Sequence, residues 1–531
     1  MIGLELVVIL GAVIVACGAL AHRTRIPQPI LLLLSGALLG FAPALREVHL
    51  PPELMLLVFL PMLLYWEALT TSLREIRATF RGVVLTSTLL VVLTAAAVAV
   101  AGHALGLPWG PAWVLGAALA PTDATAVGVL ARDLPRRQVT GLRAESLVND
   151  GTALVVYGVA VGVTVGEETL APGHVAGLVT VAYVGGVVIG GIVAWVGVIL
   201  RKHLPTVLLA NALMLLIPFV AYLLAELIGA SGVLAVVVAG LVVSRLGPRL
   251  DTAAGRTQGT GFWTLSTYLV NAMLFVLVGI EAHATYVGLG AADRTTGFVA
   301  VGIVYVVLVV VRFAFLVVSA YTIRLVDRRP SQRLRRVSNR ARVVSTVAGF
   351  RGAVSVAVAL SVPMTLGSGA PFPGRDLVVF VTAGVVATTL VVQGLLLGPV
   401  VRWAHLPDDG GVVRERHLAE TTAAQEALDA LPDLASSLGS DPAVVDRVRG
   451  EYEQRLDVLR ARDDPGEEHD PTLLLDEEYA ALRVALLAHK RETVIRLRDE
   501  NRIDDTVLRQ VQARLDVEEL RYARNRTGED E

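Results

Sequence analysis

Cysteine and charge are the two things that this sequence has least of. The chain of 531 residues contains one cysteine, Cys17, so it cannot form an internal disulfide. Charged residues make up 18% of the chain, against about 25% in ordinary soluble domains. They are also unevenly distributed: residues 1–404 contain 28 basic and 17 acidic residues, whereas 405–531 contain 18 and 31. A 404-residue stretch with so few charges excludes a soluble enzyme, a secreted disulfide scaffold and a disordered chain.

Long apolar runs fill this first part of the chain. A membrane-spanning helix needs about 20 mostly apolar residues, because each residue rises about 1.5 Å across roughly 30 Å of hydrocarbon. The sequence therefore predicts an all-α integral membrane protein with about thirteen transmembrane helices. The predicted spans are 3–21, 28–45, 52–70, 82–104, 110–131, 141–165, 175–200, 205–228, 230–244, 262–283, 296–322, 344–367 and 376–401.

The arginines of residues 1–404 predict the orientation. If the N-terminus is outside and the spans alternate, the inner loops contain 23 basic residues and the outer loops contain only Arg46, Arg294 and Arg375. Cytoplasmic loops carry an excess of Lys and Arg, and merging two spans would destroy this division. We therefore expect a multi-pass membrane protein with its N-terminus outside and its C-terminus in the cytoplasm.

Residues 405–531 are of a different kind, with a net charge of −13. Apolar residues recur at helical spacing, as at Val445, Val448 and Tyr452. We expect a cytoplasmic acidic helical domain that packs on itself, dimerises, or contacts the basic inner loops or a regulator. A solvated helical appendage without a regulatory role remains an equal alternative. The domain boundary is expected at 404/405, and no nucleotide, zinc or EF-hand pattern occurs in the tail.

Ionisable residues inside the predicted spans are the candidate functional residues. A charge at the centre of a membrane helix costs at least about 2.5–3.5 kcal/mol, so it usually faces a partner or a watery cavity. The sequence places four acidic residues and one arginine at such positions: Glu67, Asp123, Glu145, Asp150 and Arg351. Arg312 also falls within a span, and we expect it to pair with a carboxylate or a helix end.

The spacing in span 141–165 assigns helix faces. Glu145 and Asn149 are four residues apart, as are Ser146 and Asp150, so each pair is stacked on one side. One carboxylate can therefore point at a neighbouring helix while the other points at a cavity. Arg351 is the intramembrane cation expected to match Glu145 in depth, which predicts a Glu145–Arg351 ion pair.

Pro121 lies in the middle of span 110–131. Proline removes a backbone donor and clashes with the preceding turn, so the helix should break there, and broken helices at membrane depth line cavities. Freed carbonyls can coordinate a cation, and Asp123 would lie at the start of the following half-helix, where the dipole stabilises a carboxylate.

The oxygen donors in these segments suit an alkali cation. Asp150, Ser146, a Thr122 carbonyl or hydroxyl, and Glu67 are hard ligands, and no His or Cys cluster suggests a transition metal. A proton can occupy the same carboxylate. If the helix bundle changes sides only when Asp150 is occupied, competition between the two cations produces obligatory exchange.

Four segments together resemble the monovalent cation/proton antiporter family CPA1, which includes bacterial NhaP-type sodium/proton antiporters and animal sodium/proton exchangers. The segments are 59–69, 120–127, 145–153 and 349–357, in family order. The resemblance implies thirteen helices with inverted repeats, two crossed unwound helices at 110–131 and 344–367, a homodimer in lipid, and elevator-like alternating access.

The same resemblance implies a role for each motif residue. The cation and proton site is Asp150, Ser146, Thr122 (through its backbone) and Glu67; Glu145 with Arg351 forms a structural ion pair, and Asn149 and Asp123 support the crossing. The dipeptide Asn149-Asp150 replaces the two aspartates of the electrogenic branch, which indicates electroneutral exchange of one proton for one cation. No cofactor is expected beyond the transported Na⁺ and H⁺, and no nucleic acid partner.

Several function classes remain open at this point. The favoured one is exchange of Na⁺, and also Li⁺, for H⁺, with a K⁺/H⁺ antiporter as the alternative. A cation channel would share the acidic site but would need a continuous pore with rings of like groups. An intramembrane hydrolase would need a base beside Ser146, and the sequence offers no His or Lys there, so we expect no enzymatic activity.

Overall fold

A computed structural model describes most of the chain. It leaves out residues 1, 25, 43–54, 72, 124–133, 135, 167–171, 248–251, 327–337, 407–410, 462–470, 501, 503 and 528–531. The chain forms two compact units, Met1–Asp408 and Asp409–Glu531. Both units are helical, and a single antiparallel bridge between Thr365 and Pro371 is the one β-contact found among the described residues.

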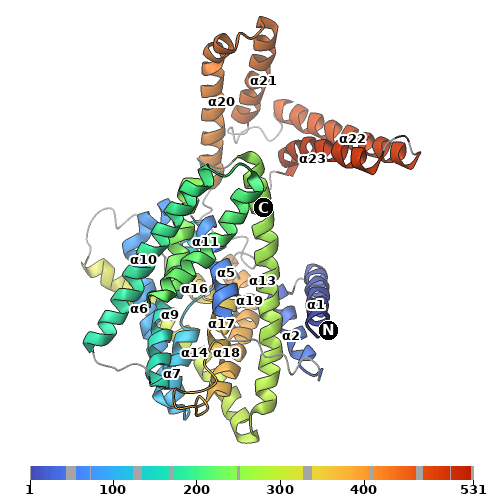
Figure 1. Cartoon of the computed structure of the whole chain (residues 1–531). Helices are drawn as coiled ribbons and strands as arrows, with labels where there is room; N and C mark the ends of the chain where they lie inside the picture. The colour runs from blue at the N-terminus through green and yellow to red at the C-terminus, as the bar shows by residue number, and fades with distance from the viewer. Residues whose placement is uncertain are drawn as a thin grey trace. The chain divides into compact units, whose positions relative to one another are not determined.

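Figure 1 shows the helices of the first unit. In chain order they are α1 (Ile2–Thr24), α2 (Gln28–Leu39), α5 (Leu60–Thr70, after a π-helical turn Met55–Phe59), α6 (Leu73–Ala104), α7 (Trp109–Leu119), α9 (Arg136–Val165), α10 (Pro172–Lys202), α11 (Val207–Leu227), α12 (Gly232–Leu246), α13 (Ala253–Gly288), α14 (Ala291–Val326), α16 (Asn339–Val347), α17 (Ala353–Leu360), α18 (Arg375–Thr388) and α19 (Gly394–Ala404, after a π-helical turn Thr389–Gln393).

Within the described residues, eight helical segments are long and apolar enough to cross a membrane. They lie in α1, α6, α9, α10, α11, α13, α14 and the α18–α19 stretch, while the shorter apolar helices are 28–39, 57–70 and 232–246. On α10, the side chains of Val184, Val188, Ile192 and Trp195 are each at least 50% exposed. Lipid, rather than water, is the environment that suits such a surface. The all-helical prediction is confirmed, whereas the count of thirteen and the inverted repeats stay predictions.

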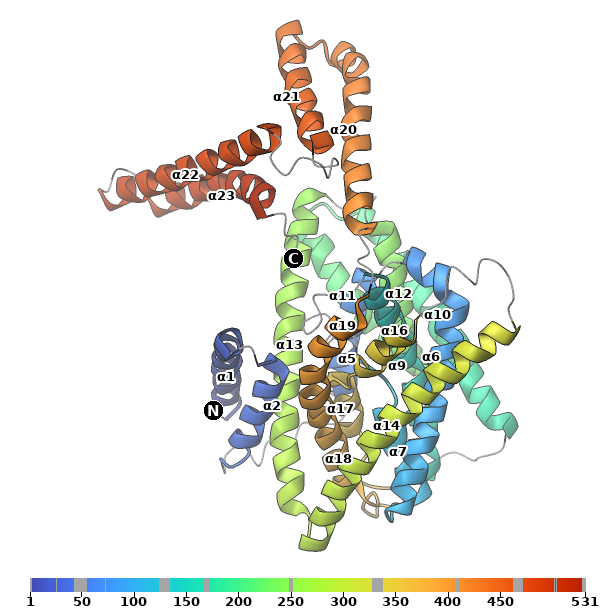
Figure 2. The same ribbon diagram turned by 180° about the vertical axis from the view of Figure 1, so that it is seen from behind.

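Two groups of mutually packed helices can be distinguished within the first unit. Helices α6, α7, α9, α14, α17 and α18 pack on one another, and α5, α10, α11 and α12 form a second group. The long helix α13 runs beside α2 in both views (Figures 1 and 2). Gly36 of α2 and Gly279 of α13 permit this contact, because a Cβ on either would collide with the other helix's backbone.

Two helices are interrupted where they meet the centre of the unit. Helix α7 ends at Leu119 and is followed by a bend at 120–121, as Pro121 predicts. The half-helix expected after Asp123 lies outside the described residues. Helix α16 ends at Val347 and α17 begins at Ala353, so residues 348–352 form a second break inside the predicted span 344–367.

The second unit consists of two helical hairpins. Helix α20 (Gly411–Leu438) packs on α21 (Pro442–Ala461), and α22 (Pro471–Asp499) packs on α23 (Asp505–Thr527). Arg491 of α22 joins the second hairpin through ion pairs with Asp516 at 2.6 Å and Glu519 at 2.5 Å.

Candidate cation and proton site

The two helix breaks touch each other directly. The backbone N–H of Asp123 donates to the carbonyl of Phe350 at 2.8 Å. Arg351 Nε donates to the carbonyl of Leu119 at 3.0 Å. A Cβ on Gly352 would overlap the Asp123 carboxylate, so only glycine fits at that position. Each break therefore satisfies backbone groups that the other leaves open, which makes irregular backbone tolerable inside an apolar bundle.

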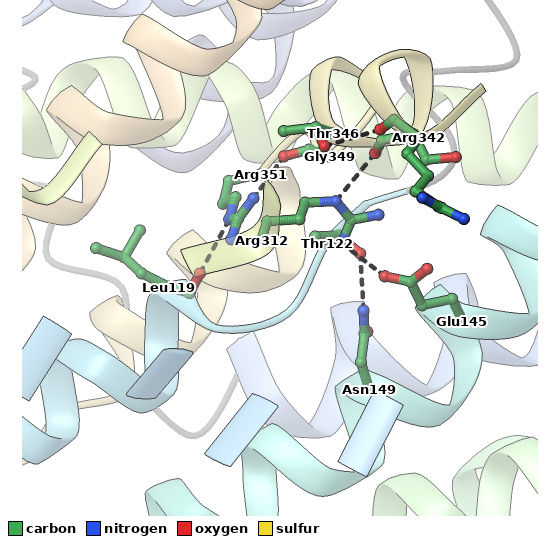
Figure 3. Close-up of polar contacts among 10 residues, drawn as sticks. Leu119, Thr122, Glu145, Asn149, Arg312, Arg342, Thr346, Gly349 and Arg351 are labelled. Atoms are coloured by element: carbon green, nitrogen blue, oxygen red, sulfur yellow. Dashed lines mark hydrogen bonds and ion pairs between the residues drawn. The ribbon is translucent and has the colours of Figure 1, made fainter. Parts of the chain in front are cut away.

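The buried ion pair of the site is formed by Arg312 and Glu145. Arg312 on α14 is 1% exposed, and its guanidinium donates to Glu145 Oε1 at 2.6 Å and through Nε to the carbonyl of Ser345 at 3.0 Å (Figure 3). The expectation that Arg312 pairs with a carboxylate is confirmed.

The predicted Glu145–Arg351 ion pair is wrong. Arg351 donates to the carbonyls of Leu119 and Gly349 instead, and the Gly349 bond is 2.5 Å long (Figure 3). Leu119 is the last residue of α7 and Gly349 lies within the second break, so neither carbonyl has the partner that a continuous helix would supply. The guanidinium of Arg351 is thereby satisfied by the breaks themselves, and Glu145 is left to Arg312.

Asn149 and Thr122 bond to each other on the same side of α9 as Glu145. Asn149 Nδ2 donates to Thr122 Oγ1 at 2.8 Å, and both side chains are buried (Figure 3). This bond connects α9 to the first break, in agreement with the supporting role expected for Asn149. The Thr122 hydroxyl is the acceptor of this bond, and Thr122 is not among the residues that line the cavity at Asp150.

Asp150 faces a separate cavity of about 360 Å³. Ser146 and Asp150 line it from α9, Glu67 from α5, and Asp123 from the first break. The α9 faces predicted by residue spacing are thus observed: Glu145 and Asn149 point at the crossing, while Ser146 and Asp150 point at the cavity. Of the four predicted ligands, the structure brings together Asp150, Ser146 and Glu67, and the Thr122 side chain is not among the lining residues.

Helix α13 contributes cavity residues that sequence reasoning did not assign to the site. Thr264, Thr267, Tyr268 and Asn271 line the cavity from this helix. Their spacing of three to four residues places polar groups on one face of an otherwise apolar span, and that signal is present in the sequence. Arg143, which the topology argument counts as an inner-loop arginine, also lines the cavity.

The cavity supplies oxygen ligands in a buried setting. Asp150 is 3% exposed, and the Glu67 and Asp123 carboxylates are close enough to interact with it electrostatically. The Glu67 Oε1 atom is buried and has no hydrogen-bond partner among the described residues. Within the same part of the chain, no three His, Cys, Asp or Glu side chains are grouped to hold a metal ion. A carboxylate with hydroxyl and amide oxygens around it is a donor set for a monovalent alkali cation.

Residues 9–403 match the protein family described as sodium/hydrogen exchanger, transmembrane. The chain belongs to this family. The resemblance derived from the four sequence segments is therefore confirmed, and the chain is a multi-pass membrane protein of the exchanger family.

Individual relatives agree with this assignment. The chain is 43% identical over 527 residues to a protein of Mycobacterium tuberculosis (strain H37Rv) named an uncharacterized Na⁺/H⁺ exchanger, covering 98% of this chain and 96% of the relative. It is 30% identical over 388 residues to a sodium, potassium, lithium and rubidium/H⁺ antiporter of Bacillus pumilus, covering 70% and 57%. The solved structure of the sodium proton antiporter MjNhaP1 of Methanocaldococcus jannaschii matches with a TM-score of 0.58 at 18% identity, over 76% of this chain and 99% of that one, which supports a shared fold.

Proposed function

We propose that this chain exchanges a monovalent cation for H⁺ across the bacterial plasma membrane, with Na⁺ as the main substrate and Li⁺ as a second one. The observation that carries the proposal is the buried Asp150 carboxylate, which lies in a cavity beside two contacting helix breaks. The chain would act as a transporter and not as an enzyme.

Competition at Asp150 is the proposed mechanism. A bare carboxylate is costly at membrane depth, so a bundle that carries Asp150 unoccupied across the membrane faces a high barrier. A proton or a cation bound with Ser146 and Glu67 removes most of that cost. Since Asp150 holds one or the other, the bundle changes sides only when loaded, and movement of one ion is coupled to counter-movement of the other.

The choice of cation follows from ligand type only in part. Na⁺ and K⁺ use the same oxygen donors and differ in the cavity size that they require. The Bacillus pumilus relative is named for transport of sodium, potassium, lithium and rubidium, so K⁺/H⁺ exchange is the second candidate. The transport assay below includes all three principal cations for this reason.

The remaining features of the proposal concern topology and assembly. Residues 1–404 would form the antiporter domain, with the N-terminus outside, and residues 405–531 an acidic cytoplasmic domain that contacts its own inner loops or a regulator. We further propose a homodimer in lipid and electroneutral one-for-one exchange. The charge asymmetry between the two parts of the chain and the Asn149-Asp150 dipeptide support these points.

The test uses everted vesicles from a host that lacks its own Na⁺/H⁺ exchange. An imposed pH gradient is followed with a fluorescent dye while Na⁺, Li⁺ or K⁺ is added. We expect dissipation by the wild type and none by Asp150→Asn at equal membrane content. Asp376→Asn is the matched control, because Asp376 is an exposed carboxylate at the start of α18. Sodium-driven proton flux retained in Asp150→Asn would overturn the mechanism.

A further inference from the structure

A second cavity lies farther along the helix that carries Asp150. Its volume is about 290 Å³, and helices α9, α10, α11 and α12 surround it. On α9 its lining begins at Leu154 and ends at Val159, whereas the first cavity is lined by Arg143, Ser146 and Asp150. The two cavities therefore follow each other along α9, with Asp150 at the boundary.

The barrier between the two cavities is short. It spans about one turn of α9, from Asp150 to Leu154, which corresponds to about 6 Å of helix. Gly151 lies in this turn, and a Cβ there would meet the Leu234 side chain of α12 at 4.0 Å. Leu154 packs against the apolar cores on both sides. A single turn of α9, which contains Gly151 and Leu154, therefore separates Asp150 from the second cavity.

Glu226 is the one carboxylate among the described residues that line the second cavity. Its Oε1 accepts a hydrogen bond from the backbone N–H of Gly232 at 3.1 Å. A Cβ on Gly232 would press on both Glu226 and the ring of Tyr222, so the position requires glycine. Tyr157 and Tyr222 also line this cavity. A fixed carboxylate in a cavity with largely apolar walls attracts monovalent cations.

We propose that the second cavity is the outer vestibule of the exchange path and that Glu226 concentrates monovalent cations in it. This inference rests on the proposed function and its topology, in which Arg143 lies toward the cytoplasm and the Glu226 end of α11 faces outward. Glu226 acts as a recruiting group, and the cation passes from it to Asp150 once α9 has moved.

Glu226→Gln separates recruitment from a purely structural role. The amide oxygen can still accept the Gly232 hydrogen bond, so the start of α12 is kept while the charge is lost. Flux is measured in two preparations. In right-side-out vesicles, Na⁺ added to the medium reaches the outer face of the protein. In everted vesicles, Na⁺ added to the medium reaches the cytoplasmic (inner) face. We expect the KM for outer Na⁺ to rise about three- to tenfold at low ionic strength and the rise to shrink at high salt. The KM for inner Na⁺ and the maximal rate should not change.

A second variant tests whether the cavity opens outward. Glu226→Cys in a Cys17→Ala background should be modified from outside by impermeant thiol reagents. A sulfonate reagent, which restores a negative charge, should lower the KM for outer Na⁺, and a trimethylammonium reagent should not. Modification from the inner face alone would overturn the proposal.

The outcomes separate the two proposals. If the wild type exchanges no monovalent cation, the proposed function fails and the vestibule with it. If the wild type exchanges Na⁺ but Glu226→Gln leaves the KM for outer Na⁺ unchanged, or shifts both faces equally, only the vestibule is refuted. The same refutation follows if Asp376→Asn, which removes an exposed carboxylate outside the cavity, produces an equal shift.

Discussion

Glu145 pairs with Arg312 and not with Arg351, and this pairing leads to a quantitative prediction. Arg312→Met removes the guanidinium that lies 2.6 Å from Glu145 and leaves that carboxylate, which is only 15% exposed, without its partner. Breaking a buried pair in this way costs about 3–5 kcal/mol of unfolding free energy. With an unfolding entropy of about 2.1 cal/mol/K per residue, applied to the unit Met1–Asp408, this predicts a fall of about 4–6 °C in Tm.

The partner assignment is tested by two double-mutant cycles on the purified full chain in detergent. One cycle combines Arg312→Met with Glu145→Gln, and the other combines Arg351→Met with Glu145→Gln. Residues that contact each other give coupling energies of about 0.5–3 kcal/mol. We expect a coupling at the upper end of that range for Arg312 and a clearly smaller one for Arg351, whose guanidinium bonds to two carbonyls.

The comparison between the cycles matters more than either single mutation. Both arginines are buried, so both single variants lower Tm, and neither alone identifies the partner of Glu145. A larger coupling for Arg351 than for Arg312 would refute the arrangement in Figure 3 and would restore the pairing expected from the sequence.

Four further predictions concern the crossing, the site and the stoichiometry. Gly352→Ala should reduce exchange and Tm because its Cβ overlaps the Asp123 carboxylate, whereas Gly141→Ala, with open space around it, should change neither. Asn149→Ala should lower the free energy of unfolding by about 1–3 kcal/mol, measured by thermal denaturation, because the buried hydrogen bond to Thr122 is lost. Glu67→Gln should raise the KM for Na⁺ about tenfold, equivalent to about 1.4 kcal/mol, with Asp150 still exchanging. Exchange should be insensitive to an imposed membrane potential, and steep dependence would contradict one-for-one stoichiometry.

Helix faces are the part of the site that the sequence predicts well. Spacing of four residues places Ser146 with Asp150 and Glu145 with Asn149, and local helix geometry alone decides the outcome. The break at Pro121 is predicted for the same reason, since proline acts on its own backbone. These features depend on residues that are neighbours in the chain.

Features that depend on distant segments are predicted poorly. To decide whether Arg312 or Arg351 pairs with Glu145, one needs the positions of α14 and of the second break in space. The membrane depth estimated from a residue's place in its span does not give these positions. Likewise, the sequence leaves the Thr122 hydroxyl as a possible ligand, whereas in the structure this hydroxyl accepts a hydrogen bond from Asn149. The cavity residues of α13 form a polar stripe on one helix face that is visible in the sequence. Such a stripe does not predict which other helix it will face.

The two faces of α9 carry carboxylates in different settings: Glu145 lies in an ion pair, and Asp150 lines a cavity. On one face, Glu145 forms an ion pair with Arg312, and the guanidinium of the neighbouring Arg351 donates to carbonyls of the breaks. On the other face, Asp150 lies with Ser146 and Glu67 in a cavity that can admit an ion. A proton or a Na⁺ on Asp150 adds the same charge. In the proposed one-for-one exchange, the charge of the loaded crossing would be equal in both directions of travel, and the transmembrane potential, worth about 2.3 kcal/mol per charge at 100 mV, would favour neither step. We propose that an asparagine at position 149 serves this balance, because its amide bonds to Thr122 without adding a second carboxylate that would have to be discharged.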